Sequence, residues 1–198
     1  MNILVVGGFL GSGKTSFILQ LAHHMIDTLG ISGVAILENE VGEYSVDDKL
    51  LRGSGLQVQS LFSGCVCCTL AGELPASIRR IEKELSPEWL IMEATGMAFP
   101  GSVRDNLQRT LGTDCRICAL ADAKRWKRLV AAMAELVHGQ LEHADVILVN
   151  KADAVDAETL AEVLTAARDI RPGVPVLPVS AAGEVPAAVF DAVLGREA

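Results

Sequence analysis

The residues best suited to chemistry form a stretch near the start of the chain, from Gly8 to Thr15, of sequence GFLGSGKT. It has the GxxxxGK[ST] pattern of a phosphate-binding loop, or P-loop. Its glycines let consecutive backbone N–H groups turn inward around a phosphate chain at a helix N-terminus, where the helix dipole favours anions. Lys14 adds a positive charge for the terminal phosphates, and the Thr15 hydroxyl suits a Mg²⁺ ion that bridges two of them. The pattern predicts a site for a nucleoside triphosphate.

A second candidate site is the NKxD pattern of residues 150–153, which follows an apolar run. The carboxylate of Asp153 can accept hydrogen bonds from the ring N–H and the exocyclic amine of guanine. Asn150 is expected to meet the opposite edge of the base, and the Lys151 stem to cover it. Adenine lacks both donors and would leave the carboxylate unpaired, at a cost of roughly 1–3 kcal/mol or more. The pattern predicts guanine, and the alternative is a helix start capped by Asn150.

Other polar residues are expected at the nucleotide because they also follow apolar runs. Glu93 stands where P-loop GTPases carry an acidic residue for the Mg²⁺ shell, and we expect it to reach the ion through water. The N–H of Gly96 is placed to sense the γ-phosphate. We assign catalysis to Lys14 and Glu93, and expect slow turnover because no residue is an obvious base. The predicted nucleotide-binding residues are Gly11, Ser12, Gly13, Lys14, Thr15, Ser16, Gly96, Asn150, Lys151, Asp153, and the Ser180 and Ala181 of the loop that supports the guanine oxygen.

Three cysteines lie within four residues in the stretch Cys65-Val66-Cys67-Cys68. Thiolates are soft ligands that suit Zn²⁺ or Cu(I), but ligands this close in sequence cannot easily complete a tetrahedral site. Glu38 or Glu43, after a neighbouring strand, can supply an oxygen. Two or three thiolates with a carboxylate would form an open site suited to metal transfer. The alternatives are a set of small buried residues and a redox pair.

Composition and charge restrict the class of protein. The chain has 198 residues, of which 50% are apolar, and this suffices for one domain with a sizeable core. A net charge of -8 argues against duplex nucleic acid or an anionic membrane as the main partner. No apolar run reaches the roughly 18 residues of a membrane span, and the first residues do not resemble a signal peptide. We therefore expect a cytoplasmic protein.

Short apolar runs alternate with helical patterns along the whole chain. Strands are expected at residues 2–6, 34–37, 56–62, 89–92, 116–121, 146–149 and 174–179. The first helix is expected to begin near Ser16, and Cys115 and Cys118 to be buried strand residues. This alternation predicts an α/β fold, a doubly wound and largely parallel sheet flanked by helices. Each motif falls directly after a strand, where open sheets of this class bind ligands.

Taken in order, the motifs GFLGSGKT, ENEVGE, GCVCCT, EATG and NKAD resemble the CobW family of P-loop GTPases over nearly the whole chain. The resemblance implies a P-loop NTPase fold, with GTP, Mg²⁺ and Zn²⁺ or another transition metal as cofactors. It makes Cys67, Cys68 and Glu38 the expected metal ligands, with Cys65 and Glu43 nearby. Many relatives continue into a second domain, often with histidine-rich stretches. We expect residues 1–198 to form a GTPase domain alone, without a C-terminal domain.

By this resemblance, members couple GTP binding and slow hydrolysis to metal delivery, or support cobalamin enzymes. Our first hypothesis is a metallochaperone in which the γ-phosphate controls the segment between Glu38 and Cys68. The second is a GTPase that gates assembly or reactivation of a corrinoid or nickel enzyme. The third is a metal or redox sensor that binds nucleotide without hydrolysing it. The sequence leaves open the recipient metalloprotein and whether nucleotide or metal drives a homodimer.

Overall fold

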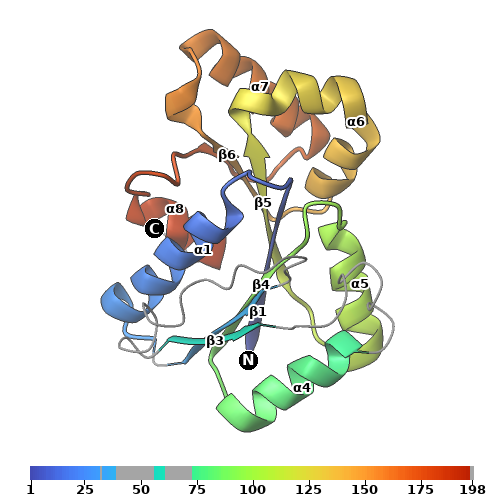
Figure 1. The fold of residues 1–198 in the computed structure, drawn as a ribbon, viewed down its shortest axis with the longest axis vertical. Coiled ribbons are helices and arrows are strands. Elements are labelled where there is room, and N and C mark those ends of the chain that lie inside the picture. The colour runs from blue at the N-terminus through green and yellow to red at the C-terminus, as the bar shows by residue number, and fades with distance from the viewer. Residues whose placement is uncertain (32, 39–55, 61–72, 197–198) are drawn as a thin grey trace.

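The computed structural model describes residues 1–31, 33–38, 56–60 and 73–196 (Figure 1). The strands are β1 (Asn2–Gly8), β2 (Val34–Glu38), β3 (Leu56–Ser60), β4 (Trp89–Glu93), β5 (Arg116–Asp122), β6 (Val146–Asn150) and β7 (Val176–Pro178). The helices are α1 (Lys14–His23), α4 (Glu73–Leu85), α5 (Pro100–Leu111), α6 (Trp126–Leu141), α7 (Ala157–Ile170) and α8 (Ala187–Leu194). A π-helical turn (His24–Thr28) extends α1, and 3₁₀ turns occupy Ala123–Arg125 and Ala152–Ala154.

In the described part of the chain, the seven strands form one sheet in the order β3-β2-β4-β1-β5-β6-β7, and every pair is parallel. This confirms the predicted doubly wound α/β fold. The strands that precede the motifs end together at one edge: Val6 pairs with Glu93, and Asp122 with Asn150. Residues far apart in sequence are therefore gathered at the carboxyl edge of the sheet, where such folds bind ligands.

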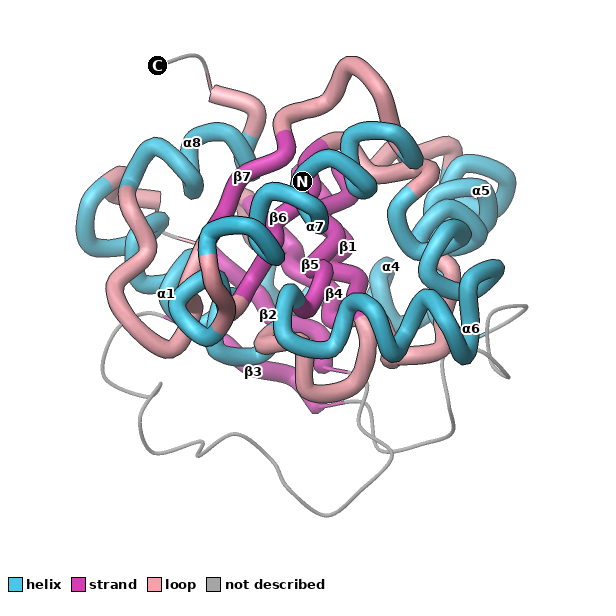
Figure 2. Tube along the Cα trace, turned by 90° about the horizontal axis from the view of Figure 1, so that it is seen from above, coloured by secondary structure: helices cyan, strands magenta, loops and turns pink. Residues whose placement is uncertain are grey.

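Helices cover both faces of the sheet (Figure 2). Along β1 the side chains alternate between two cores: Ile3 and Val5 join one, while Leu4 and Val6 join the other. The first core includes residues of α4, α5, α6 and α7, and the second residues of α1 and α8. Burial on both faces explains why the strands are continuous apolar runs. Cys115 and Cys118 are both buried, one in each core, and Cys118 lies in β5 while Cys115 directly precedes it.

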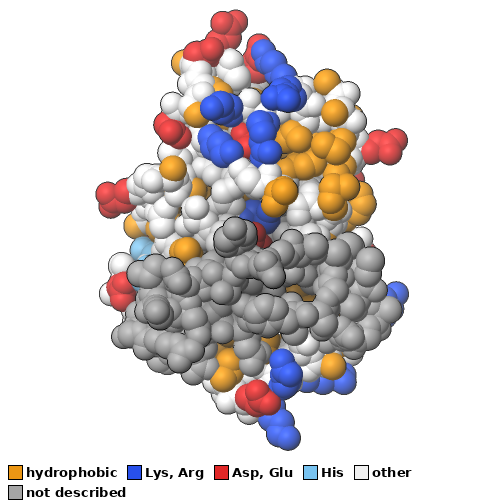
Figure 3. Space-filling view, viewed as in Figure 1, with side chains coloured by type: hydrophobic (Ala, Val, Ile, Leu, Met, Phe, Trp, Pro, Cys, Tyr) orange, Lys and Arg blue, Asp and Glu red, His pale blue; other side chains and the backbone are white. Residues whose placement is uncertain are grey.

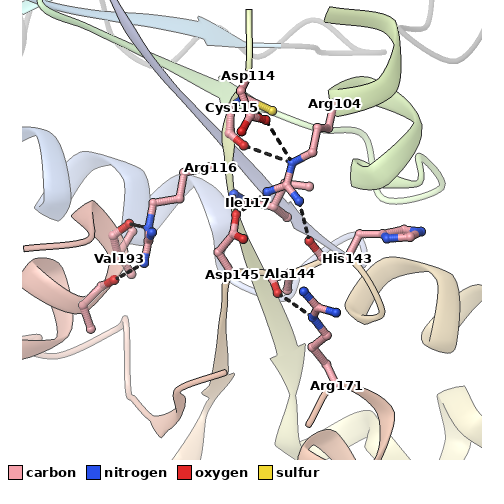
Figure 4. A network of polar contacts seen from close by, with 11 residues as sticks. Arg104, Asp114, Cys115, Arg116, Ile117, His143, Ala144, Asp145, Arg171 and Val193 are labelled. Atoms are coloured by element: carbon pink, nitrogen blue, oxygen red, sulfur yellow. Dashed lines mark hydrogen bonds and ion pairs between the residues drawn. The ribbon is translucent and has the colours of Figure 1, made fainter. Parts of the chain in front are cut away.

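A network of polar contacts fastens the helices at the start of β5, away from the motif-bearing edge (Figure 4). Arg104 of α5 donates to the carbonyl of Cys115 (3.0 Å) and forms an ion pair with Asp145. Asp145 in turn accepts a hydrogen bond from the N–H of Ile117 (2.8 Å). Arg116 donates to two carbonyls near the end of α8, at 2.8 and 3.0 Å. The network ties α5, α8 and the start of β6 to the start of β5.

Two helices begin earlier in the chain than the apolar pattern predicts. α1 begins at Lys14, because Gly13 adopts a left-handed conformation (φ 96°) that carries the loop straight into the helix. The sequence also predicts a helix from about Ser102 to Leu111. This helix, α5, begins at Pro100, since proline is well suited to the first helical position. Among the described residues, no helix is both long and apolar enough to cross a membrane.

Candidate functional site

A cavity of about 560 Å³ opens at the carboxyl edge of the sheet. Its walls come from the P-loop, Glu93, Lys124, the segment 150–154 and the pair Ala181–Ala182. Lys14, Lys124 and Lys151 all line it, and Lys and Arg side chains gather in the upper half of the face shown in Figure 3. In a chain of net charge -8, this local concentration of cations favours an anionic ligand.

The P-loop backbone depends on glycine at three positions. Gly8, Gly11 and Gly13 all have positive φ angles, of 136°, 70° and 96°. A Cβ atom on Gly13 would also lie 2.2 Å from the Nδ2 of Asn150. The N–H of Ser12 donates to the carbonyl of Phe9 (3.0 Å), and Ser12 is buried behind the loop. Of the residues predicted to bind the nucleotide, Gly11, Gly13, Lys14, Thr15 and Ser16 line the cavity, whereas Ser12 does not.

Lys14 is held by the backbone of the P-loop to which it belongs. Its Nζ donates to the carbonyls of Gly8 (3.1 Å) and Phe9 (3.3 Å), and lies 3.7 Å from Oε1 of Glu93. Only 5% of the side chain is exposed. Burial lowers the pKa of Lys14, and the neighbouring Glu93 carboxylate offsets this only in part. A phosphate oxygen beside Lys14 would relieve the cost of the buried cation.

The two residues predicted for Mg²⁺ contact each other. The Thr15 hydroxyl donates to Oε2 of Glu93 (2.9 Å) and lies 3.1 Å from its Oε1. Hard oxygen ligands suit Mg²⁺, which usually keeps several waters, so this contact is compatible with a Thr15 hydroxyl on the ion and a Glu93 carboxylate that reaches it through water. The pair therefore fits the ion, with Thr15 at the start of α1 and Glu93 at the end of β4.

Asn150 fastens two loops together. Its Nδ2 donates to the carbonyl of Ser12 (2.6 Å), and its Oδ1 accepts from the N–H of Ala181 (2.8 Å). The residue is buried, so the side chain holds the P-loop against the loop after β7. The predicted contact with guanine stays a prediction. The alternative of a helix cap is wrong: the 3₁₀ turn that follows begins after Lys151 and has no side-chain cap.

Asp153 faces the cavity in a different setting. Asp153 is exposed and lines the cavity. Its backbone N–H donates to the Ser180 hydroxyl (3.2 Å). Ala181 lines the cavity, and Ser180 supports Asp153 from outside the lining. Gln20 of α1, which the sequence did not single out, donates to the Ala181 carbonyl (2.8 Å) and so fixes this loop. The carboxylate of Asp153 is thus presented on a braced turn.

Asp122, at the end of β5, is a second residue that motif spacing missed. Its Oδ2 accepts from Lys151 (2.7 Å) and Arg125 (2.6 Å), and its side chain is fully buried. Burial would raise the pKa of this carboxyl, but the hydrogen bonds and charges of Lys151 and Arg125 outweigh it and keep the pKa below its usual value. The available signal in the sequence was an acidic residue at the end of a predicted strand.

Gly96 lies against the P-loop outside the cavity lining. A Cβ atom on Gly96 would lie 2.5 Å from the backbone nitrogen of Leu10, so any larger residue would push the two loops apart. The carbonyl of Gly96 accepts a hydrogen bond from Nε2 of the buried Gln140 (2.7 Å). Gln140 therefore links α6 to the loop after β4, a connection that motif spacing did not reveal.

The predicted metal ligands fall mostly outside the described residues. Cys65, Cys67, Cys68 and Glu43 lie outside them, and of Glu38 the structure describes the backbone at the end of β2. Within the described ranges, no group of three His, Cys, Asp or Glu residues is placed to hold a metal ion. The thiolate site therefore stays a prediction.

Comparisons with known proteins agree with this geometry. The family model for the CobW/HypB/UreG nucleotide-binding domain matches residues 2–178. The chain is 33% identical to the zinc chaperone YjiA of Escherichia coli over 173 residues, covering 81% of this chain and 52% of that protein. It is 31% identical to the zinc chaperone YeiR of the same organism, covering 78% of this chain and 48% of that protein. The chain thus spans about half the length of these curated relatives.

Solved structures show the same fold. The zinc-bound YjiA GTPase of E. coli superposes with a TM-score of 0.63 at 26% identity, covering 96% of this chain and 60% of that one. The hydrogenase maturation factor HypB of Archaeoglobus fulgidus superposes with a TM-score of 0.67 at 16% identity, covering 98% and 89%. At 16% identity, the second likeness concerns the fold alone.

Proposed function

The chain belongs to the CobW/HypB/UreG nucleotide-binding family, as a CobW-like P-loop GTPase domain, and from that premise we propose a function. We propose that it binds and slowly hydrolyses GTP in the cavity, and that its nucleotide state controls the binding and delivery of a transition metal, zinc in the first place.

One observation carries the nucleotide part of this proposal. A single cavity brings together a phosphate-binding loop with a buried lysine, a hydroxyl–carboxylate pair that fits Mg²⁺, and an exposed carboxylate suited to guanine. These features come from β1, β4 and β6, and only the folded sheet places them around one space.

Each residue has a part in this proposal. Lys14 balances the charge of the terminal phosphates, and Asp153 accepts hydrogen bonds from guanine. Thr15 and Glu93 hold the magnesium ion, which when bound neutralises charge on the β- and γ-phosphate oxygens. Among the described residues of the cavity lining, the carboxylates belong to Glu93 and Asp153, and Glu93 already accepts the Thr15 hydroxyl. With Asp153 at the base, no carboxylate of the described lining is left to activate water, which supports slow turnover.

The metal part is supported by the sheet and by the relatives. Leu37 pairs with Met92, so β2 and β4 end side by side at Glu38 and Glu93. Glu38 also pairs with Ser60 of β3, so the segment that carries the cysteines begins beside Glu38. YjiA and YeiR are named zinc chaperones, and a Dictyostelium discoideum relative is named a zinc-regulated GTPase metalloprotein activator. Nucleotide and metal sites on neighbouring strands can be coupled by thermodynamic linkage.

The test is the zinc affinity of the reduced protein, measured with GDP and with a nonhydrolysable GTP analogue. We expect the two affinities to differ at least fivefold, within the usual range of coupling between sites. The double variant Cys67→Ala/Cys68→Ala should lose zinc binding and keep GDP binding. Equal zinc affinities in the two nucleotide states would overturn the coupling, and unchanged zinc binding by the double variant would overturn the ligand assignment.

A further inference from the structure

One buried carboxylate joins two cations to the outer side of the P-loop. Asp122 does not line the cavity, but both of its cationic partners contact the P-loop, which does. Lys151 donates to the carbonyl of Gly11 (2.7 Å), and Arg125 donates to the carbonyl of Leu10 (2.6 Å). We call Asp122, Lys151 and Arg125 the carboxylate clamp.

The clamp is closely fitted at its centre. Oδ2 of Asp122 accepts from both Lys151 Nζ (2.7 Å) and Arg125 Nε (2.6 Å), while Oδ1 accepts from the backbone N–H of Arg125 (3.1 Å). The Asp122 side chain is fully buried, whereas those of Lys151 and Arg125 are 34% and 36% exposed. The carboxylate is the fixed point of the clamp, and the two long side chains take their positions from it.

Holding these two carbonyls also sets the direction of the loop's donors. In a planar trans peptide the C=O and the following N–H point in opposite directions. Fixing the carbonyl of Leu10 therefore fixes the direction of the Gly11 N–H, and fixing that of Gly11 holds the Ser12 N–H on the Phe9 carbonyl within the loop. A phosphate-binding loop works through N–H groups such as that of Gly11, and a loop that is already ordered loses less conformational entropy on binding.

The charge of Asp122 is required for this arrangement. Lys151 and Arg125 meet at a single carboxylate oxygen, and without its negative charge the two cations would repel each other. Lys151 also adopts a left-handed backbone conformation (φ 63°) at the turn that leads to Asp153. The same carboxylate thus positions a residue beside the base and the loop that takes the phosphates.

We propose that Asp122 is the positioning residue of the nucleotide site: through the carboxylate clamp it sets the affinity for the base and for the phosphates together, without touching either. This inference rests on the proposed function, because it assumes that the cavity binds a nucleotide. It distinguishes Asp122 from the residues of the P-loop and NKxD motifs, which line the cavity or brace it directly.

The test compares wild type with Asp122→Asn, using calorimetric titration of GDP and of inorganic pyrophosphate, each with Mg²⁺. We expect the affinities for both ligands to fall at least tenfold. A fall for GDP alone would show that Asp122 acts only beside the base, and would overturn its role in the P-loop. Unchanged affinities would overturn the inference as a whole. If wild type bound neither ligand, the proposed function itself would fail.

A second variant guards against simple misfolding of Asp122→Asn. Arg125→Ala removes the contact with Leu10 from a part-exposed position, and should weaken both ligands at least threefold. In the Asp122→Asn background the same change should have little further effect, because Arg125 has already lost its anchor. Its full effect in both backgrounds would contradict the clamp. Arg128→Ala, at an exposed position on α6, is the matched control and should leave both affinities unchanged.

Discussion

Asn150 and Asp153 belong to one four-residue motif but have different surroundings. Asn150 is 2% exposed and forms hydrogen bonds with two backbone groups of other loops. Asp153 is exposed and lines the cavity. One residue of the motif therefore supports the shape of the site, and the other is placed to meet a ligand. The effects of substituting them should separate into stability and binding.

Asn150→Ala should destabilise the nucleotide-free protein. It leaves the carbonyl of Ser12 and the N–H of Ala181 without their side-chain partner in a buried place, at a cost of about 2–3 kcal/mol. Asp153→Ala should change the free energy of unfolding by no more than about 0.5 kcal/mol, because the side chain is exposed. Denaturant unfolding measures both. Equal losses from the two variants would contradict the holding role of Asn150.

The buried Asp122 carboxylate should make stability depend on pH in acid. Its pKa in the folded protein lies below the usual value, of about 3.9 in an unfolded chain. The ionised carboxylate therefore contributes stability that is fully present above pH 3.9 or so, and that is lost as the pH falls through the folded-state pKa. We expect the unfolding free energy of wild type to fall more steeply below about pH 4 than that of Asp122→Asn. Parallel curves for the two proteins would contradict this assignment.

At the scale of elements, one end of the sheet carries the cavity and the other carries contacts that stabilise the fold. The carboxyl edge carries the cavity, while the start of β5 carries the network around Arg104 (Figure 4). Arg104 contacts the carbonyls of Cys115 and His143 and pairs with Asp145. These contacts join α5 to β5 and to the turn before β6. They hold the elements together at a distance from the ligand.

Arg104→Ala should therefore affect stability and leave binding unchanged. Losing two partly buried contacts and one exposed contact should lower the free energy of unfolding by about 1–3 kcal/mol. GDP affinity, measured well below the unfolding temperature, should stay within about twofold of wild type, a change of under 0.5 kcal/mol. Arg109→Ala, at an exposed position of the same helix, serves as the control for stability. A large loss of GDP affinity would show that the two ends of the sheet are coupled.

The sequence was sufficient for the order of elements, whereas the residues expected to touch the ligand stay a prediction. Continuous apolar runs predicted strands buried on both faces, and the motifs predicted the edge at which the cavity lies. It could not reveal Gln20, Asp122 or Gln140. Gln20 meets Ala181 across 161 positions and Gln140 meets Gly96 across 44, so their partners depend on the folded sheet and not on local spacing.

At the scale of the whole molecule, topology brings the proposed parts of the nucleotide site to one edge. β1, β4 and β6 lead to the proposed phosphate, magnesium and base positions, β2 pairs with β4, and β3 pairs with β2. The cations of the cavity stand out from a chain of net charge -8. Because neighbouring strands end at the same edge, a ligand bound at one strand end can affect a site at the next. The proposed coupling of nucleotide and metal requires this.

The most direct test of this account is the choice of base by Asp153. A carboxylate accepts hydrogen bonds from the ring N–H and amine of guanine, whereas an amide in its place can donate to the C2 carbonyl that xanthine has instead of the amine. Calorimetry of GDP and xanthosine diphosphate with wild type and Asp153→Asn should show a reversal: wild type prefers GDP by at least tenfold, and the variant prefers the xanthine nucleotide. The same base preference in both proteins would contradict the assignment of this cavity to guanine.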